Sequence, residues 1–152
     1  MSGDAVARSL ELYQRPVTAG LIIIGADVDQ VRPWLAVDQT TVDRLSTAWP
    51  GPVTWVVPCD PDAPPWVTGG RETVAVRVTA HPVANALCRA FGRAIVSTSA
   101  NRRGRPPARS ALSVKLRFPA QSIDYVLPGP TGGADRPTEI RDADSGRILR
   151  AG

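Results

Sequence analysis

The sequence predicts an α/β fold: a single domain with one twisted, mixed and open β-sheet flanked by helices. Its length of 152 residues is typical of one domain, so we expect residues 1–152 to fold as one domain. Hydrophobic residues make up 43% of the chain, which is enough for a core and excludes wholesale disorder. Apolar runs of strand length are interspersed with segments of helical pattern but do not alternate with them strictly, which favours a sheet of mixed direction.

The most regular predicted strand is 73–79. Val74, Val76 and Val78 share one face of this strand, so Arg77 points to the opposite face. Short apolar runs bounded by Gly, Pro or polar residues predict the other strands, at 20–26, 53–57, 94–97 and 123–127. Two further runs, 138–142 and 147–150, predict a hairpin that turns across residues 144–146.

The predicted helices begin and end at residues with known capping roles. A helix at 28–35 follows Asp27, and one at 41–48 is expected to be capped near Thr40. Pro82 is well placed in the first turn of a helix at 82–91, which Gly92 should end. The last predicted helix spans 111–118.

Composition excludes several classes of protein. No apolar run approaches the roughly 20 residues of a membrane-spanning helix, and the N-terminus does not resemble a signal peptide, so we expect a cytoplasmic protein without membrane contact. Two cysteines, Cys59 and Cys88, and one histidine, His81, predict buried free thiols and no metal site. Of 18 basic residues, all but Lys115 are arginine, and the net charge of +4 is compatible with anionic ligands or RNA.

The most informative stretch for function is Ser97-Thr98-Ser99-Ala100-Asn101, which directly follows a predicted strand. Hydroxyls, an amide and backbone N–H groups at a strand end can bind a ligand at the rim of the sheet. The same groups could equally serve a capped turn that satisfies only the local backbone.

Two groups of arginines are candidates for binding anions. Arg77 lies beside apolar valines on a regular strand and needs an anionic partner, either a ligand or a structural carboxylate. Four more arginines follow the hydroxyl-rich stretch with no acidic residue among them, and they predict either a solvated basic loop or contacts with nucleotide phosphate or RNA. These four are Arg102, Arg103, Arg105 and Arg109.

The ordered set of motifs resembles the threonylcarbamoyl-adenylate synthase family, the YrdC-like domain. The similarity covers nearly the whole chain, and the matching segments occur in the order of the family. They are Gln14-Arg15-Pro16 with Gly20-Leu21-Ile22-Ile23; Trp49-Pro50-Gly51-Pro52-Val53-Thr54; Val74-Ala75-Val76-Arg77-Val78 with His81-Pro82; Ser97 to Asn101 with Gly104 and Pro106-Pro107; Gly132-Gly133; Pro137-Thr138-Glu139-Ile140; and Ile148-Leu149-Arg150-Ala151-Gly152.

The resemblance implies a YrdC-like sheet and condensation of L-threonine, bicarbonate and ATP into threonylcarbamoyl-AMP and pyrophosphate. That product supplies the threonylcarbamoyl modification of adenosine 37 in tRNAs that read codons beginning with A, so tRNA and the enzymes that transfer the group are implied partners. Mg²⁺ would accompany ATP as its counter-ion, and no tightly bound cofactor is expected.

The resemblance also assigns roles to individual residues. It implies that Arg15 is catalytic and holds phosphate. The other positions implied to contact ATP are Thr54, Ser99, Asn101 and Arg150. Those implied to grip threonine are Arg77, which would bind its carboxylate, Ser97 and Thr138. Arg102, Arg103, Arg105 and Arg109 stay candidates for RNA or phosphate contacts.

Two departures from the family pattern favour an alternative function. Tyr13 stands where the family has a lysine, and its phenol carries no charge at pH 7. We also expect that the chain begins inside the family's fold, without the opening strand and a Pro-Thr-Glu segment. The alternative is a catalytically impaired paralogue that binds nucleotide, double-stranded RNA or tRNA.

Overall fold

A computed structural model describes residues 2–129, 131–132 and 137–152, and it divides the chain into two compact units. The first, which we call the sheet unit, comprises Val17–Ser97 and Arg136–Gly152. The second, which we call the basic unit, comprises Ser2–Pro16 and Thr98–Asp135. Gly133, part of the Gly132-Gly133 motif, lies outside the described residues.

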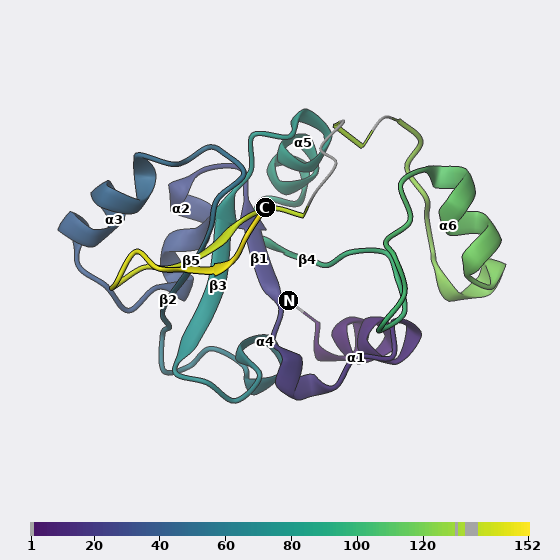
Figure 1. Ribbon diagram of the computed structural model, residues 1–152, viewed down its shortest axis with the longest axis horizontal. Helices are drawn as coiled ribbons and strands as arrows, with labels where there is room; N and C mark the ends of the chain where they lie inside the picture. Colours follow the sequence, from purple (N-terminus) through teal and green to yellow (C-terminus); the bar gives the residue numbers. More distant parts are fainter. Residues whose placement is uncertain (1, 130, 133–136) are drawn as a thin grey trace. The chain divides into compact units, whose positions relative to one another are not determined.

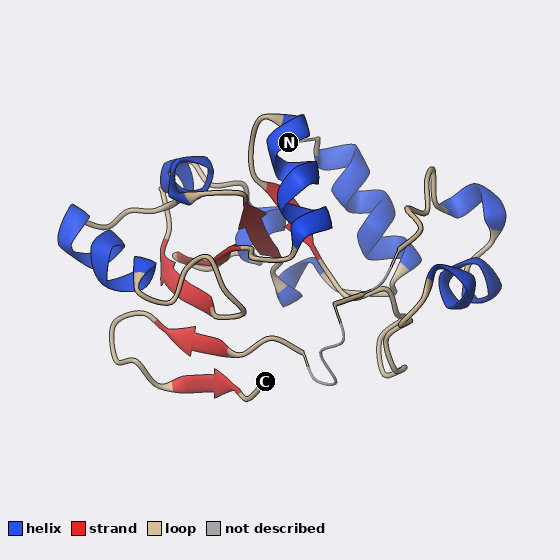
Figure 2. Ribbon diagram, turned by 90° about the horizontal axis from the view of Figure 1, so that it is seen from above, coloured by secondary structure: helices blue, strands red, loops and turns tan. Residues whose placement is uncertain are grey.

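The sheet unit contains one six-stranded sheet in the order β4-β1-β3-β2-β5-β6. β1 pairs with β3 and β2 with β5 in parallel, whereas the β1–β4, β2–β3 and β5–β6 pairs are antiparallel. The expected mixed sheet and the C-terminal hairpin are therefore confirmed, and Figure 2 shows the antiparallel hairpin ending near the C-terminus. The strands are β1 Ile22–Gly25, β2 Thr54–Pro58, β3 Thr73–Val78, β4 Ile95–Ser97, β5 Ile140–Asp142 and β6 Ile148–Arg150.

The two faces of this sheet carry different side chains. The valine face, named for Val74, Val76 and Val78, packs against α2 (Val28–Val31), α3 (Gln39–Ser46) and α4 (Pro65–Thr68), which bury Val31, Leu45 and Val67 in the same core. The opposite face carries Arg77, and we call it the arginine face. Figure 1 shows α2 and α3 on one side of the strands and α5 (Pro82–Phe91) on the other. Cys88 of α5 packs there on Ile24 and Ala26, so α5 covers the arginine face over β1 and β4.

The helix boundaries follow local capping chemistry. Pro82 starts α5 and Gly92, at a φ of 72°, ends it, as predicted. The predicted helix at 28–35 is α-helical only to Val31, after which Arg32–Trp34 forms a 3-10 turn containing Pro33, because proline lacks the N–H that continues an α-helix. The N-cap of α3 is Asp38, two residues before Thr40, near which the cap was expected. The Asp38 carboxylate accepts from Thr41 N at 2.8 Å.

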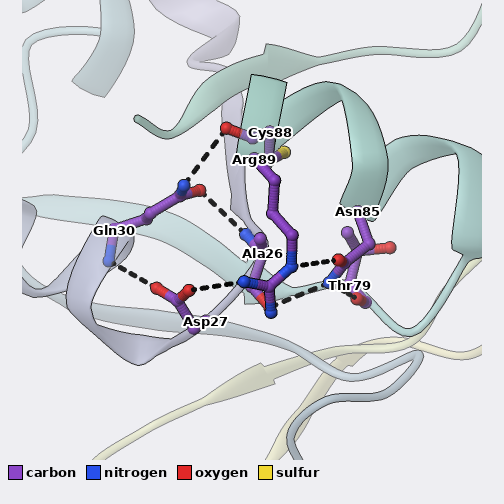
Figure 3. Close-up of polar contacts among 7 residues, drawn as sticks. All are labelled: Ala26, Asp27, Gln30, Thr79, Asn85, Cys88 and Arg89. Atoms are coloured by element: carbon purple, nitrogen blue, oxygen red, sulfur yellow. Dashed lines mark hydrogen bonds and ion pairs between the residues drawn. The ribbon is translucent and has the colours of Figure 1, made fainter. Parts of the chain in front are cut away.

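A polar network fixes α5 to the end of β1 (Figure 3). Asn85 Nδ2 donates to Ala26 O at 2.9 Å, and the Asn85 Oδ1 atom accepts from Arg89 Nε at 2.9 Å. Arg89 in turn lies 3.7 Å from a carboxylate oxygen of Asp27, the residue that caps α2. Gln30 spans the same gap by accepting from Ala26 N and donating to the backbone carbonyl of Cys88. The backbone groups at the carboxyl end of β1 are thus satisfied within the chain.

The basic unit contains α1 (Gly3–Leu12), α6 (Ala111–Arg117) and the 3-10 turn Ala120–Ser122. The sequence prediction missed α1, although its signals are present. Ser2 accepts from Ala5 N as an N-cap, and Val6 and Leu10, four residues apart, are buried.

The strand predicted at 123–127 is wrong. No strand is assigned there, and Tyr125 and Leu127 are 73% and 44% exposed. Its β-branched and aromatic residues suit a strand, but strand propensity has an effect only where a neighbouring strand offers hydrogen bonds.

Both cysteines are free thiols, but only Cys88 is buried, whereas Cys59 is half-exposed. Within the described residues, none of the helices combines the length and apolar character needed to cross a bilayer.

Candidate functional site

The sheet gathers the predicted residues of its unit onto the arginine face. Trp55 pairs with Val76 on the valine face. Thr54 is one residue before Trp55 and Arg77 is one residue after Val76, so both lie on the opposite face. Arg150 pairs with Ile140, which itself pairs with Thr54, so Arg150 is on that face too. Ser97 reaches it from β4, where it pairs with Ile22; Ile22 in turn pairs with Ala75, which shares the face of Arg77.

Arg77, Thr138 and Arg150 form the centre of this group. Arg77 Nη1 donates to Thr138 Oγ1 at 2.6 Å, and Arg150 Nη2 donates to the Thr138 carbonyl at 2.8 Å. Burial lowers the pKa of the Arg77 guanidinium from its ordinary value, and the nearby charge of Arg150 lowers it further. Two guanidinium groups that contact the same residue, one at its hydroxyl and one at its carbonyl, are suited to binding an anion.

Arg77 has no carboxylate partner among the residues that the structure describes. The sequence predicted either a ligand or a structural carboxylate as the partner of Arg77. No structural carboxylate is found beside it within the described part of the chain. A partly buried guanidinium that only donates to a hydroxyl keeps further donors for a ligand. This is the observation that best supports an anion site on the arginine face.

Thr54 and Ser97 add hydroxyls to the same face. Thr54 is fully buried, and its Oγ1 atom has no hydrogen-bond partner in the described structure, although its backbone N–H donates to Glu139 O. Ser97 is half-buried at the end of β4. An unpaired buried hydroxyl costs free energy, so Thr54 Oγ1 is a further group that a ligand could satisfy.

The basic unit brings together the other predicted residues, Arg15, Ser99 and Asn101. Arg15 Nη2 donates to Ser99 Oγ at 2.8 Å and to Asn101 Oδ1 at 3.4 Å. Arg15 Nε is buried without a partner in the described structure. Thr98 Oγ1 is likewise buried without a partner; it lies within the hydroxyl-rich stretch but is not among the residues predicted from the sequence. These groups, 84 residues apart in sequence, form a cluster suited to phosphate oxygens.

Asn101 also holds the loop that carries the four arginines. Its Nδ2 atom donates to Arg102 O at 3.0 Å and to Arg105 O at 2.8 Å. The sequence left two alternatives for Asn101, a capped turn and a ligand site. Asn101 caps the turn with its Nδ2 atom and contacts Arg15 of the candidate site with its Oδ1 atom, so the two roles are compatible. Arg102, Arg103, Arg105 and Arg109 are all exposed.

Tyr13 anchors the loop without bringing a charge. Its carbonyl accepts from Arg103 N at 2.9 Å, and its ring meets that of Phe118 edge-on, with centroids 5.5 Å apart. Burial raises the pKa of the Tyr13 phenol above its ordinary value, and the nearby Arg15 charge opposes only part of this shift. The phenol is therefore neutral at pH 7.

No cluster of three or more His, Cys, Asp or Glu side chains occurs among the described residues.

Comparison with known proteins is consistent with this arrangement. Residues 1–152 match the Sua5/YciO/YrdC family, described as "Telomere recombination". The chain is 54% identical over 149 residues to threonylcarbamoyl-AMP synthase of Alkalilimnicola ehrlichii and 53% identical over 150 residues to that of Halorhodospira halophila. These alignments cover 97% and 98% of the chain and 78% of each relative.

Solved structures of this family share the fold. P. abyssi Sua5, crystallised with L-threonine, superposes with a TM-score of 0.84 at 32% identity, over 93% of this chain and 42% of Sua5. E. coli YciO superposes with a TM-score of 0.78 at 21% identity, over 99% of this chain and 74% of YciO, and shows the fold alone. The match along the whole chain and the identity to its relatives show that this protein belongs to the Sua5/YciO/YrdC family.

Proposed function

We propose that this chain is a threonylcarbamoyl-AMP synthase, which condenses L-threonine, bicarbonate and ATP into threonylcarbamoyl-AMP and pyrophosphate. Two relatives with this name are 54% and 53% identical to it. The structural observation that carries the proposal is Arg77, a partly buried cation without a carboxylate among the described residues.

In this proposal the arginine face of the sheet binds threonine. Arg77 binds the threonine carboxylate through charge-assisted hydrogen bonds, and Thr138 orients the guanidinium by accepting one of its N–H groups. Ser97, at the end of β4, supplies a hydroxyl to the same ligand. Burial strengthens each of these contacts because water competes less for them.

The chemistry requires two bonds to form. The threonine amine attacks bicarbonate and loses water to give a carbamate, and a carbamate oxygen then attacks the α-phosphorus of ATP. The bond from the α-phosphorus to the bridging oxygen breaks, and pyrophosphate leaves with that oxygen. Negative charge accumulates on the phosphates, so cationic groups accelerate the reaction.

Arg15, Ser99 and Asn101 are the residues that we assign to these phosphates, with Arg15 as the catalytic cation. Thr54 and Arg150 are assigned to the nucleotide from the sheet unit. ATP enters as its magnesium complex, and the ion offsets phosphate charge. The product serves the modification of tRNA, and we expect the chain to act with the transfer enzymes in the cytoplasm.

The test is an assay of pyrophosphate release and of threonylcarbamoyl-AMP formation from labelled threonine. We expect product from the wild type and a loss of kcat/KM for threonine of about 100-fold or more in Arg77→Ala, since a buried charge contact is removed. Arg147→Ala, which removes an exposed arginine at the β5–β6 turn, is the matched control. Absence of product from the folded wild type would refute the proposal.

A binding role without catalysis is the alternative function, and the exposed loop arginines are the observation that favours it. The same assay separates the two, because a binder shows nucleotide or RNA affinity but makes no product. We propose that the loop contacts tRNA or double-stranded RNA in either case.

A further inference from the structure

A cavity of about 440 Å³ lies within the sheet unit, and none of the residues assigned above to threonine or ATP lines it. Its walls come from the 3-10 turn Arg32–Trp34, the loop at 60–64 and the link at 93–94 between α5 and β4. Trp34 and Ala94 pack with the core of the valine face, so the cavity adjoins that face and not the arginine face. Its volume falls in the range of about 300–1,000 Å³ that is usual for small-molecule sites.

Hydrogen bonds within the chain fix the loop that forms one wall. Asp60 N donates to Trp34 O at 3.0 Å, and Asp60 O accepts from Ala63 N at 2.9 Å. Asp60 Oδ1 accepts from Asp62 N at 2.9 Å, which closes the turn. The wall is therefore formed before any ligand binds, which reduces the entropy lost on binding.

Charges of both signs line this cavity without neutralising each other. Asp60 and Asp62 contribute two carboxylates, and Arg93 contributes a guanidinium. No ion pair joins Arg93 to either aspartate in the part of the chain that the structure describes; its guanidinium lies 5.8 Å from the centroid of the Phe91 ring instead. The side chain of Asp62 likewise accepts no hydrogen bond from a described residue. A molecule that carries both an ammonium and a carboxylate group satisfies both sides at once.

The remaining lining of the cavity is mostly apolar. Trp34 is half-buried, and the aliphatic surface around it comes from Pro33, Ala63, Pro64 and Ala94. An apolar side chain gains free energy by leaving water for such a surface, and an aromatic ring gains more by packing on an indole. Threonine, with its short polar side chain, makes poor use of this lining.

We propose that the cavity binds a free α-amino acid with an apolar, preferably aromatic, side chain, as a second amino-acid site separate from that on the arginine face. Asp60 and Asp62 bind its ammonium group, Arg93 binds its carboxylate, and its side chain packs against Trp34. The inference does not depend on the proposed function, because none of these four residues is assigned to the reaction.

The experiment uses L-phenylalanine as the probe and proton–nitrogen NMR of the full chain as the measurement. We expect the indole N–H resonance of Trp34, identified by its loss in Trp34→Phe, to shift saturably as L-phenylalanine is added. N-acetyl-L-phenylalanine lacks the ammonium group and L-phenylalaninamide lacks the carboxylate. Each analogue should bind about three- to fivefold more weakly, the effect of losing one ion pair between solvent-exposed groups.

Two charge-removing variants assign the two ends of the ligand. Asp62→Asn should weaken L-phenylalanine binding about three- to fivefold and reduce its advantage over the N-acetyl form, but not its advantage over the amide. Arg93→Gln should reduce the advantage over the amide alone. Asp144→Asn and Arg147→Ala remove the same charges from the exposed β5–β6 turn, so as matched controls they should bind all three ligands like the wild type.

The inference is overturned if L-phenylalanine causes no saturable shift, if the three ligands bind equally, or if both cavity variants weaken all three alike. Tighter binding of the amide would reveal a site for cations alone, and displacement of L-phenylalanine by L-threonine would place both ligands in one site; either result also overturns it. The same spectra report folding, so if one variant unfolds, the other variant and the analogues decide. The pyrophosphate assay tests the proposed function separately.

Discussion

At the scale of single residues, Thr138 determines how Arg77 presents its charge. The Thr138 hydroxyl accepts from Arg77 Nη1 at 2.6 Å while the Thr138 carbonyl accepts from Arg150. The side chain and backbone of one residue thus orient two guanidinium groups. A threonine at this position is therefore not interchangeable with an apolar residue of the same shape.

We predict that Thr138→Val raises the KM for threonine by about tenfold, because Arg77 loses the hydroxyl that orients it, and that kcat changes less. Thr138→Ser, which keeps the hydroxyl, should resemble the wild type. Steady-state kinetics with threonine as the varied substrate provide the measurement. Equal KM values for the two variants would contradict the assigned role.

The second residue-scale prediction concerns Tyr13, where the sequence resemblance implies a lysine in the family. Its phenol is neutral at pH 7, and no hydrogen bond from its hydroxyl is found among the described residues, whereas its ring packs on Phe118. We therefore expect Tyr13→Phe to keep wild-type activity and Tyr13→Ala to lower the free energy of unfolding by about 3 kcal/mol or less, given partial burial. Urea unfolding and the pyrophosphate assay test both variants, and a large loss of activity in Tyr13→Phe would show that the hydroxyl takes part in the reaction.

At the scale of elements, the β5–β6 hairpin depends on an acidic residue at its turn. Asp142 Oδ1 accepts from Ser145 N at 2.8 Å and from Ser145 Oγ at 2.7 Å, and these bonds lower the pKa of Asp142 below its ordinary value of 3.8. A depressed pKa in the folded state means that the stabilisation is present above pH 3.8 and is lost as pH falls through the folded value.

We predict that the hairpin loosens in acid while it is unaffected between neutral pH and pH 5. The exchange of the Ser145 amide proton, followed by NMR, should accelerate as Asp142 becomes protonated. Asp142→Asn should exchange at a rate that does not depend on pH in this window, after correction for intrinsic exchange. Acid-induced loosening of the same size in that variant would assign the effect to another group.

At the scale of the whole molecule, the excess positive charge belongs to one unit. The sequence of the basic unit has eight basic and four acidic residues, whereas that of the sheet unit has ten of each, so the formal net charge of +4 is carried by the basic unit. A charge of this kind attracts polyanions through release of their counterions.

We predict that binding of tRNA weakens as salt rises and that replacing Arg102, Arg103 and Arg105 with alanine makes this salt dependence shallower. Each phosphate contact that is lost should reduce the slope of log K against log [salt] by about one. Replacement of three exposed arginines of the sheet unit, Arg44, Arg93 and Arg147, provides a control of equal charge. Equal changes in slope for both triple variants would show that the basic unit has no special role.

Elements with local determinants were predictable from the sequence. Pro82 and Gly92 define α5 at both ends, and the alternation of valines in β3 places Arg77 on the polar face. The strand predicted at 123–127 is wrong because a strand also needs a neighbouring strand to pair with, and the local sequence does not show whether one is present.

The candidate residues could be selected from the order of the motifs in the sequence, but the contacts between them could not be predicted. Arg77 and Thr138 are 61 residues apart, and Arg15 and Ser99 are 84 apart. The ion pair of Glu139 with Arg141 and the contact of Arg141 with the Trp55 ring could not be predicted from the sequence either, because two opposite charges in a predicted strand most simply indicate solvent-exposed side chains.

The sequence by itself therefore determined the chemistry available to this protein: the family, the hydroxyls and the arginines, and the face of β3 on which Arg77 stands. Only the tertiary structure decided which of these groups meet, because hydrogen-bonded pairing of distant strands sets their register. A change of register by one residue moves every side chain of a strand to the other face of the sheet.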